Sequence, residues 1–115
     1  MVKKVIEKSG IAYYRTHLEV INPLLPIQMT RKEIEVLSFL IKFREDLRGK
    51  LDDLEEDVYR LYLRKKLGMT PAALHNHIKS LVDKGAILDS DSGEVNNILL
   101  PGGDSEEYYI KIKKV

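Results

Sequence analysis

The segment LRKKLGMTPAALHNHIKSLVDKGAIL, residues 63–88, constrains the fold most, because it holds one complete helix between two helix-ending glycines. Thr70 has a side chain that accepts hydrogen bonds from the free N–H groups of a helix start, and the fixed φ of Pro71 suits a first helical turn. Gly68 and Gly85 suit the left-handed backbone that often follows a helix end. The segment therefore predicts a helix that ends before Gly68, a short turn, and a further helix closed by Gly85.

Another helix is predicted upstream, where the sequence TRKE, residues 30–33, forms a capping box. The Thr30 side chain can accept from a free backbone N–H of the first turn, and the Glu33 side chain can reach back to the backbone before it. Apolar residues then recur at helical spacing as far as Leu47, and Gly49 is expected to end the helix. The residues predicted to be buried in the core are Leu37, Leu40, Ile41, Leu61, Leu74, Ile78 and Leu81.

Other segments carry the alternating pattern of strands. Residues 11–21 place Tyr14 and Leu18 on one side and Arg15 and Glu19 on the other, which predicts a half-exposed strand. Two further strands are predicted on either side of the polar loop DSDSGE, and a terminal strand is predicted in EEYYIKIKKV. The predicted fold class is α+β, in a single domain over residues 1–115, with a core over about 30–100 and flanking strands over about 11–21 and 106–114.

The composition narrows the functional classes. The 115-residue chain has 19 Lys and Arg against 18 Asp and Glu, a formal net charge of +1, which is less basic than is usual for an autonomous DNA-binding domain. It has no Cys, which excludes a disulfide framework and a Cys nucleophile. The chain shows no signal peptide, no apolar run of membrane-spanning length and no catalytic motif. We expect a non-enzymatic, cytoplasmic protein that needs no metal or cofactor and does not enter a membrane.

The acidic run DDLEED, residues 52–57, has two interpretations. It is typical of a solvated helix start, where acidic side chains favour the positive end of the helix dipole. A cluster that binds a divalent metal is the alternative. The first interpretation is preferred, because runs of charge usually form solvated surfaces.

The order helix, LGMT turn, helix and hairpin resembles the winged helix-turn-helix family, in particular MarR-like transcription regulators. The resemblance covers about residues 30–100 and extends to small proteins of this type encoded by bacteriophages. It is carried by the LGMT turn, by Leu74, Ile78 and Leu81, and by the sequence LVDKGAI that leads into the hairpin. It implies a three-helix core with a β-hairpin wing, to which the N-terminal and C-terminal strands are additions, and a DNA-binding regulator of transcription.

The same resemblance implies which residues would contact double-stranded DNA. In a helix-turn-helix the outward face of the second helix enters the major groove. Asn76 would pair bidentately with adenine, Lys79 would hold phosphate or a base edge, and cations of the preceding helix would hold the backbone. The predicted DNA-binding residues are Thr70, Pro71, Ala72, His75, Asn76, Lys79, Arg64, Lys65 and Lys66.

The hairpin loop points to an alternative function. Winged domains commonly carry Arg or Lys at the hairpin tip, whereas Asp89, Asp91 and Glu94 would be repelled by phosphate. The alternative is a non-enzymatic protein-interaction or structural subunit, for example of a phage or other assembly, that uses a winged-helix fold. Because strand edges recruit partners by main-chain pairing, the two predicted terminal strands would pair within the chain, across a homodimer or with another protein.

Overall fold

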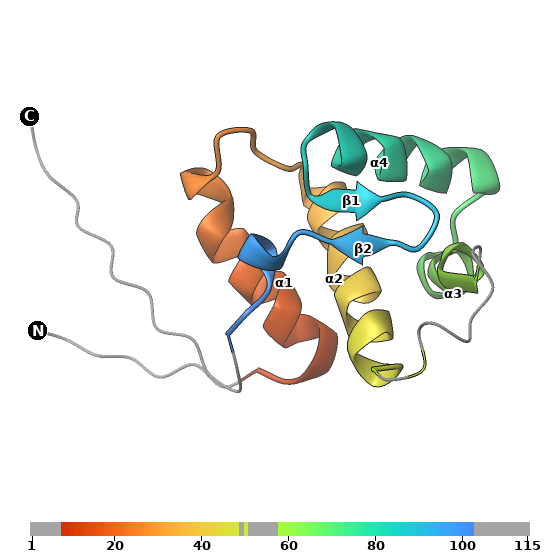
Figure 1. Cartoon of the computed structure of the whole chain (residues 1–115), viewed down its shortest axis with the longest axis horizontal. Coiled ribbons are helices and arrows are strands. Elements are labelled where there is room, and N and C mark those ends of the chain that lie inside the picture. Colours follow the sequence, from red (N-terminus) through yellow and green to blue (C-terminus); the bar gives the residue numbers. More distant parts are fainter. Residues whose placement is uncertain (1–7, 49, 51–57, 103–115) are drawn as a thin grey trace, which may run out of the picture.

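The computed structural model describes residues 8–48, 50 and 58–102, which form an α+β structure of helices and one small antiparallel hairpin (Figure 1). Helix α2 lies centrally, with α1 packed on one side and α3 and α4 on the other. The described elements, in chain order, are α1 (Gly10–Ile21), the 3-10 helix η1 (Asn22–Leu24), α2 (Arg31–Asp46), α3 (Val58–Leu67), α4 (Pro71–Asp83), β1 (Ile87–Asp89), β2 (Glu94–Val95) and the 3-10 helix η3 (Asn97–Leu99).

The strand predicted for residues 11–21 is wrong, because this segment forms α1. Its buried and half-buried residues include Tyr14, His17, Leu18 and Ile21, which recur at the three- and four-residue spacing of a helix face. Tyr14 and Leu18 also fit a two-residue alternation, so the sequence carries both periods. Packing of this face against α2 favours the helix over the strand.

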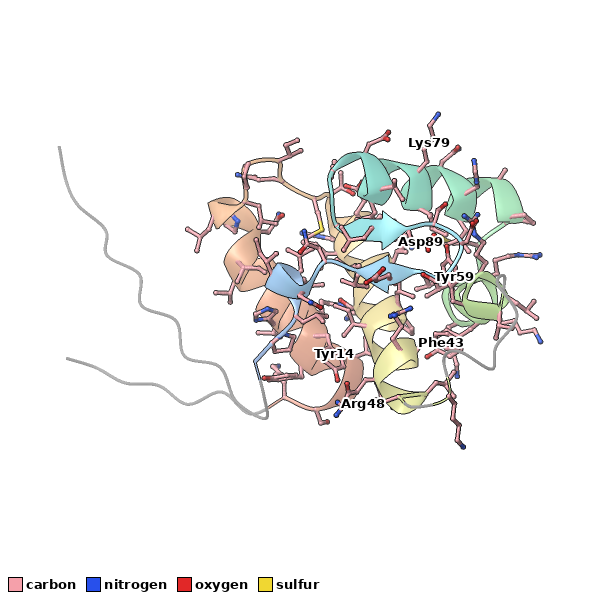
Figure 2. All side chains as sticks on the ribbon, in the orientation of Figure 1. Tyr14, Phe43, Arg48, Tyr59, Lys79 and Asp89 are labelled. Atoms are coloured by element: carbon pink, nitrogen blue, oxygen red, sulfur yellow. The ribbon has the colours of Figure 1, made fainter. Side chains whose placement is uncertain are left out.

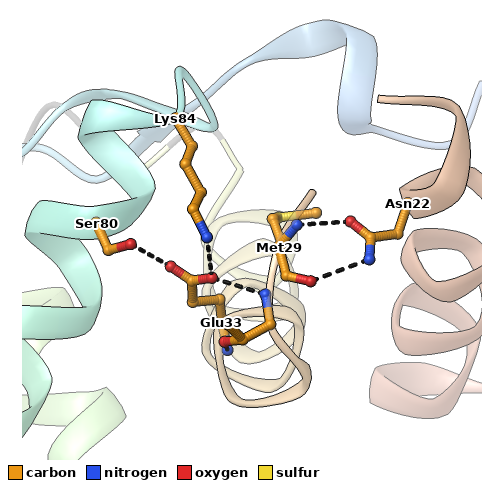
Figure 3. Close-up of polar contacts among 6 residues, drawn as sticks. Asn22, Met29, Glu33, Ser80 and Lys84 are labelled. Carbon is orange, nitrogen blue, oxygen red and sulfur yellow. Dashed lines mark hydrogen bonds and ion pairs between the residues drawn. The ribbon is translucent and has the colours of Figure 1, made fainter. Parts of the chain in front are cut away.

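The Asn22 side chain closes the loop that joins α1 to α2. Its Nδ2 donates to the Met29 carbonyl at 3.0 Å, and its Oδ1 accepts from the Met29 backbone N–H at 2.8 Å (Figure 3). The two ends of the loop are therefore held together, which fixes where α2 begins relative to the end of α1.

The capping box predicted at the start of α2 is confirmed. Thr30 Oγ1 accepts from the Glu33 backbone N–H at 3.2 Å, and Glu33 Oε1 accepts from the Thr30 backbone N–H at 2.7 Å. The helix ends at Asp46, with Leu47 at its C-cap, rather than at Gly49, which lies outside the described residues.

The helix–turn–helix predicted around Gly68 is also confirmed. Gly68 follows α3 with a φ of +64°, and the next residue, Met69, donates its backbone N–H to the Arg64 carbonyl at 3.2 Å. Thr70 Oγ1 then accepts from the Ala73 backbone N–H at 3.2 Å and caps α4. Gly85 follows α4 with a φ of +78°, as a helix-ending glycine should.

The hairpin is shorter than the sequence predicted. Strand β1 pairs antiparallel with β2, with Ile87 opposite Val95, and the register is irregular between Ile87 and Asp89. The second strand stops at Val95 because Asn96 Oδ1 accepts from the Ile98 backbone N–H at 3.2 Å and starts η3. The predicted strand over residues 106–114 and the acidic run over residues 52–57 lie outside the described residues.

The core lies between α1, α2, α3, α4 and the hairpin, and it confirms the predicted burial of Leu37, Leu40, Ile41, Leu74, Ile78 and Leu81. The prediction for Leu61 is wrong, since this side chain is 49% exposed. Tyr59 and Leu63 share the inward face of α3, and at roughly 100° per residue Leu61 points about 200° away from Tyr59.

Candidate functional site

Helix α4 presents one whole face to solvent. Its opposite face is buried through Leu74, Ile78 and Leu81. Lys79 projects from α4 away from the body of the protein (Figure 2). The exposed positions on this outward face are Ala72, His75, Asn76, Lys79 and Asp83, which include four of the predicted DNA-binding residues. The first turn of the helix is open as well, because Thr70 and Pro71 are both exposed.

One flank of α4 is fixed to the start of α2 by the Glu33 carboxylate. Lys84 Nζ donates to Glu33 Oε1 at 2.6 Å, and the Ser80 hydroxyl donates to Glu33 Oε2 (Figure 3). The Glu33 side chain is 3% exposed, so these bonds form largely away from water. Burial alone would raise the pKa of Glu33, but the hydrogen bonds from Lys84, Ser80 and Thr30 outweigh it and lower the pKa to about 2.

The other flank of α4 is held by Arg60 of α3. The Arg60 guanidinium places Nη1 3.4 Å from Nδ1 of His75 and donates from Nη2 to the Ser90 carbonyl at 3.4 Å. Its Nε donates to the Tyr59 hydroxyl at 3.2 Å, and its Cζ lies 5.7 Å from the centre of the Tyr59 ring. Arg60 therefore connects α3, α4 and the hairpin loop at a single point.

The hairpin loop lies against the core rather than projecting from it. The Tyr59 hydroxyl donates to the Ser90 carbonyl, and Arg44 of α2 donates to the Ser92 carbonyl at 2.9 Å. Gly93 is buried with a φ of +75°, and a Cβ at this position would lie 3.2 Å from Leu40 Cδ1 and from the Tyr59 ring. The loop backbone is thus pinned from two helices.

The acidic side chains of this pinned loop remain at the surface. Asp89, Asp91 and Glu94 are all exposed. Two of the basic groups near them, Arg44 and Arg60, donate to backbone carbonyls of the loop rather than to these carboxylates. The loop therefore presents negative charge beside the N-terminal half of α4, where Arg60 meets His75.

The cations predicted on α3 do not converge. Arg64 is half-buried, whereas Lys65 and Lys66 are exposed, and consecutive residues of a helix point roughly 100° apart. Lys66 Nζ lies 5.9 Å from the centre of the Tyr62 ring, which in turn packs on Phe43 at a centroid distance of 4.8 Å. This places Lys66 toward the end of α2.

Two basic residues that contact α4 or the hairpin loop, Arg60 and Arg44, are not among the predicted DNA-binding residues. Arg60 lies one helical turn before Arg64, and residues four apart share a side of a helix. Arg64 therefore lies on the same side of α3 as Arg60, which contacts α4, whereas Lys65 and Lys66 point to other sides of the helix. The spacing was visible in the sequence, but the contacts of Arg60 with His75 and Ser90 depend on the tertiary fold. The same is true of Arg44, whose partner Ser92 is 48 residues away.

Two features are absent from the described residues: a cluster of metal-ligating side chains and a membrane-spanning helix. Among residues 8–48, 50 and 58–102, no three or more His, Cys, Asp and Glu side chains gather in a way that could hold a metal ion. Within the same ranges, no helix has both the length and the apolar character needed to cross a bilayer.

Comparison with known proteins gives no significant match, whether to a protein family, to a curated protein or to a solved structure. The candidate site therefore rests on the geometry of α4 and its neighbours.

Proposed function

We propose that the protein is a winged helix-turn-helix protein that binds double-stranded DNA and regulates transcription. The observation that carries this proposal is α4, a capped helix with one face buried and the whole opposite face and first turn exposed. A helix of this kind fits the major groove of B-DNA, where base edges can be read. The order α2, α3, α4, β1 and β2 matches the order of elements expected for the winged-helix core.

Within this proposal, the exposed residues of α4 have distinct roles. Asn76 reads a base edge, since an amide can pair bidentately with adenine. Lys79 contacts phosphate or a guanine edge. Arg60 and Arg64 hold the phosphate backbone from α3. This pair is favoured over Lys65 and Lys66 because Arg60 contacts His75 of α4 and Arg64 lies one turn further along the same side of α3.

The hairpin contributes no attraction for phosphate in this proposal. Its backbone is held on the core by Tyr59, Arg60 and Arg44, and its exposed side chains are acidic. Three cations, Lys79, Arg60 and Arg64, are placed to contact phosphate beside the major groove of the DNA. The affinity for DNA of random sequence should therefore be modest and strongly dependent on salt.

The experiment that tests the proposal is a fluorescence anisotropy titration of the full chain on a short duplex of random sequence. Neutralising three phosphates predicts a slope of about −2.7 in log K against log salt, or roughly 40-fold weaker binding at about 200 mM than at about 50 mM salt. Lys79→Gln should reduce this slope. No binding at the lower salt concentration, where attraction is least screened, would overturn the proposal.

A second candidate function is protein interaction, which the pinned acidic loop favours. A rigid loop that presents Asp89, Asp91 and Glu94 is suited to a basic protein surface, because complementary charge steers association. Replacing these three residues by Asn, Asn and Gln separates the two functions. Their neutralisation should weaken a complex with a basic protein but strengthen binding to DNA.

A further inference from the structure

An apolar groove lies on the described part of the protein at the end of α4 away from the helix-turn-helix. It is an open cavity of about 220 Å³ between the loop that joins α1 to α2 and the 3-10 helix η3. The side chains that make it apolar are Leu25, Ile27, Met29, Ala86, Ile98 and Leu99.

Large apolar side chains around this groove are unusually open to water. Ile98 is 70% exposed and Ile27 is 56% exposed, and Leu24, next to the groove residue Leu25, is 74% exposed. Isolated exposed apolar residues are normal, but a cluster of them around a concave surface marks a contact site.

The polar residues of the groove already have partners. The Lys84 ammonium is bound to Glu33, and the Asn96 side chain donates to the Gly85 carbonyl at 3.1 Å and accepts from the Ile98 backbone N–H. The groove therefore offers apolar contact rather than charge or free hydrogen-bonding groups to an occupant.

The sequence of the chain itself contains an apolar segment that fits this chemistry. Residues 103–115 follow the last described residue, Gly102, and lie outside the described residues. In an extended segment, alternate positions share one edge, so Tyr108, Ile110 and Ile112 would lie on one edge and Tyr109 and Lys111 on the other. Tyr108 is nine residues beyond the groove residue Leu99, and that length spans up to roughly 30 Å, enough to turn back.

We propose that this C-terminal segment docks on the same molecule, with the apolar edge of Tyr108, Ile110 and Ile112 covering the groove at Ile27 and Ile98. Docking removes the exposed apolar side chains of the groove from water, which the hydrophobic effect favours. The other edge of the segment, with its lysines, stays in solvent.

A double-mutant cycle in the full chain tests the docking, read by urea unfolding. Ile98→Ser and Ile110→Ser should each lower the folding equilibrium constant about tenfold, and the double variant should lower it little further, because both remove one contact. The matched controls are Leu88→Ser, at a residue 57% exposed on β1, and Tyr109→Ser, on the other edge of the segment. The losses in folding free energy should be additive when Leu88→Ser is combined with Ile110→Ser, and when Tyr109→Ser is combined with Ile98→Ser. Additivity between Ile98→Ser and Ile110→Ser would overturn the proposal.

A labelling experiment gives an independent readout, since the chain has no Cys of its own. A single Cys introduced by Ile98→Cys should react with a thiol reagent at least about tenfold more slowly than one introduced by Leu88→Cys, because only position 98 is covered. Adding Ile110→Ser should make the two rates similar. Equal rates in the full chain would overturn the proposal. A third outcome would also overturn it: non-additive losses for Ile98→Ser and Ile110→Ser together with the sedimentation mass of a dimer. The segment would then cover the groove of a second copy.

Discussion

The carboxylate of Glu33 lies 2.6 Å from the ammonium of Lys84 and joins the first turn of α2 to the residue that follows α4. The same carboxylate accepts from Ser80 in α4 and from the backbone of Thr30. One capping residue of α2 therefore also sets the position of the helix that carries the candidate site. Because the carboxylate is buried and fully engaged, its charge state should influence the stability of the whole arrangement.

The first prediction concerns acid stability. The pKa of Glu33 is about 2 in the folded protein against an ordinary value of 4.5, so the charged carboxylate favours the folded state above pH 4.5. That stabilisation, about 3 kcal/mol, should be lost progressively as the pH falls from 4.5 toward 2. Urea unfolding across this range should show the loss. Glu33→Gln should remove that part of the pH dependence, whereas Glu35→Gln, at a more exposed residue paired with Lys32, should leave it in place.

The second prediction concerns the contact of the hairpin loop with the core. Gly93→Ala should destabilise the protein by about 2–4 kcal/mol, because a left-handed backbone strains an L-residue and the new Cβ meets Leu40 and Tyr59. Gly68→Ala is the matched control, since its φ is also positive but no atom lies within 4 Å of the new Cβ. It should cost only about 1–2 kcal/mol. Equal losses for both variants in urea unfolding would show that the loop does not pack as described.

The third prediction compares two apolar residues of neighbouring helices. Ile78→Ala should lower the free energy of unfolding by roughly 2–5 kcal/mol, because the side chain is 1% exposed in the core. Leu61→Ala, at a residue that is 49% exposed, should cost less than about 1 kcal/mol. A loss under about half a kcal/mol for Ile78→Ala in chemical denaturation would contradict its place in the core.

The fourth prediction separates base reading from phosphate contact in the proposed DNA complex. After a preferred site has been selected from a random pool, Asn76→Ala should weaken binding to that site by roughly 1–3 kcal/mol and leave binding to random duplex unchanged. Arg64→Gln should weaken all sequences alike and reduce the salt slope by about 1.

The control for the phosphate contact is Lys66→Gln, because Lys66 lies over the Tyr62 ring on another side of α3. It should leave the salt slope unchanged. A slope that falls equally for Arg64→Gln and Lys66→Gln would assign the phosphate contacts to α3 as a whole instead of to its Arg60 side.

The fifth prediction concerns the acidic loop. Replacing Asp89, Asp91 and Glu94 by their amides should strengthen binding to random duplex by up to about tenfold at low salt, since it removes like-charge repulsion close to α4. The effect should fade as salt rises. Unchanged affinity in the anisotropy titration would mean that the loop stays far from the phosphates.

The sequence by itself determined the features that depend on neighbouring residues. Thr30 with Glu33, and Thr70 with Ala73, form their caps within one helical turn, and Gly68 and Gly85 take the positive φ that their positions require. These features could be predicted because the atoms involved are separated by three or four residues. The exposed face of α4 followed in the same way from the spacing of Leu74, Ile78 and Leu81.

Only the tertiary structure decided what depends on distant partners. The segment over residues 11–21 carries both a strand and a helix period, and packing against α2 selects the helix α1. Glu33 reaches Ser80 and Lys84 across 47 and 51 residues, and Arg60 reaches Ser90 across 30. Local propensity carries no information on such pairs, because their geometry exists only once the helices have packed and excluded water from between them.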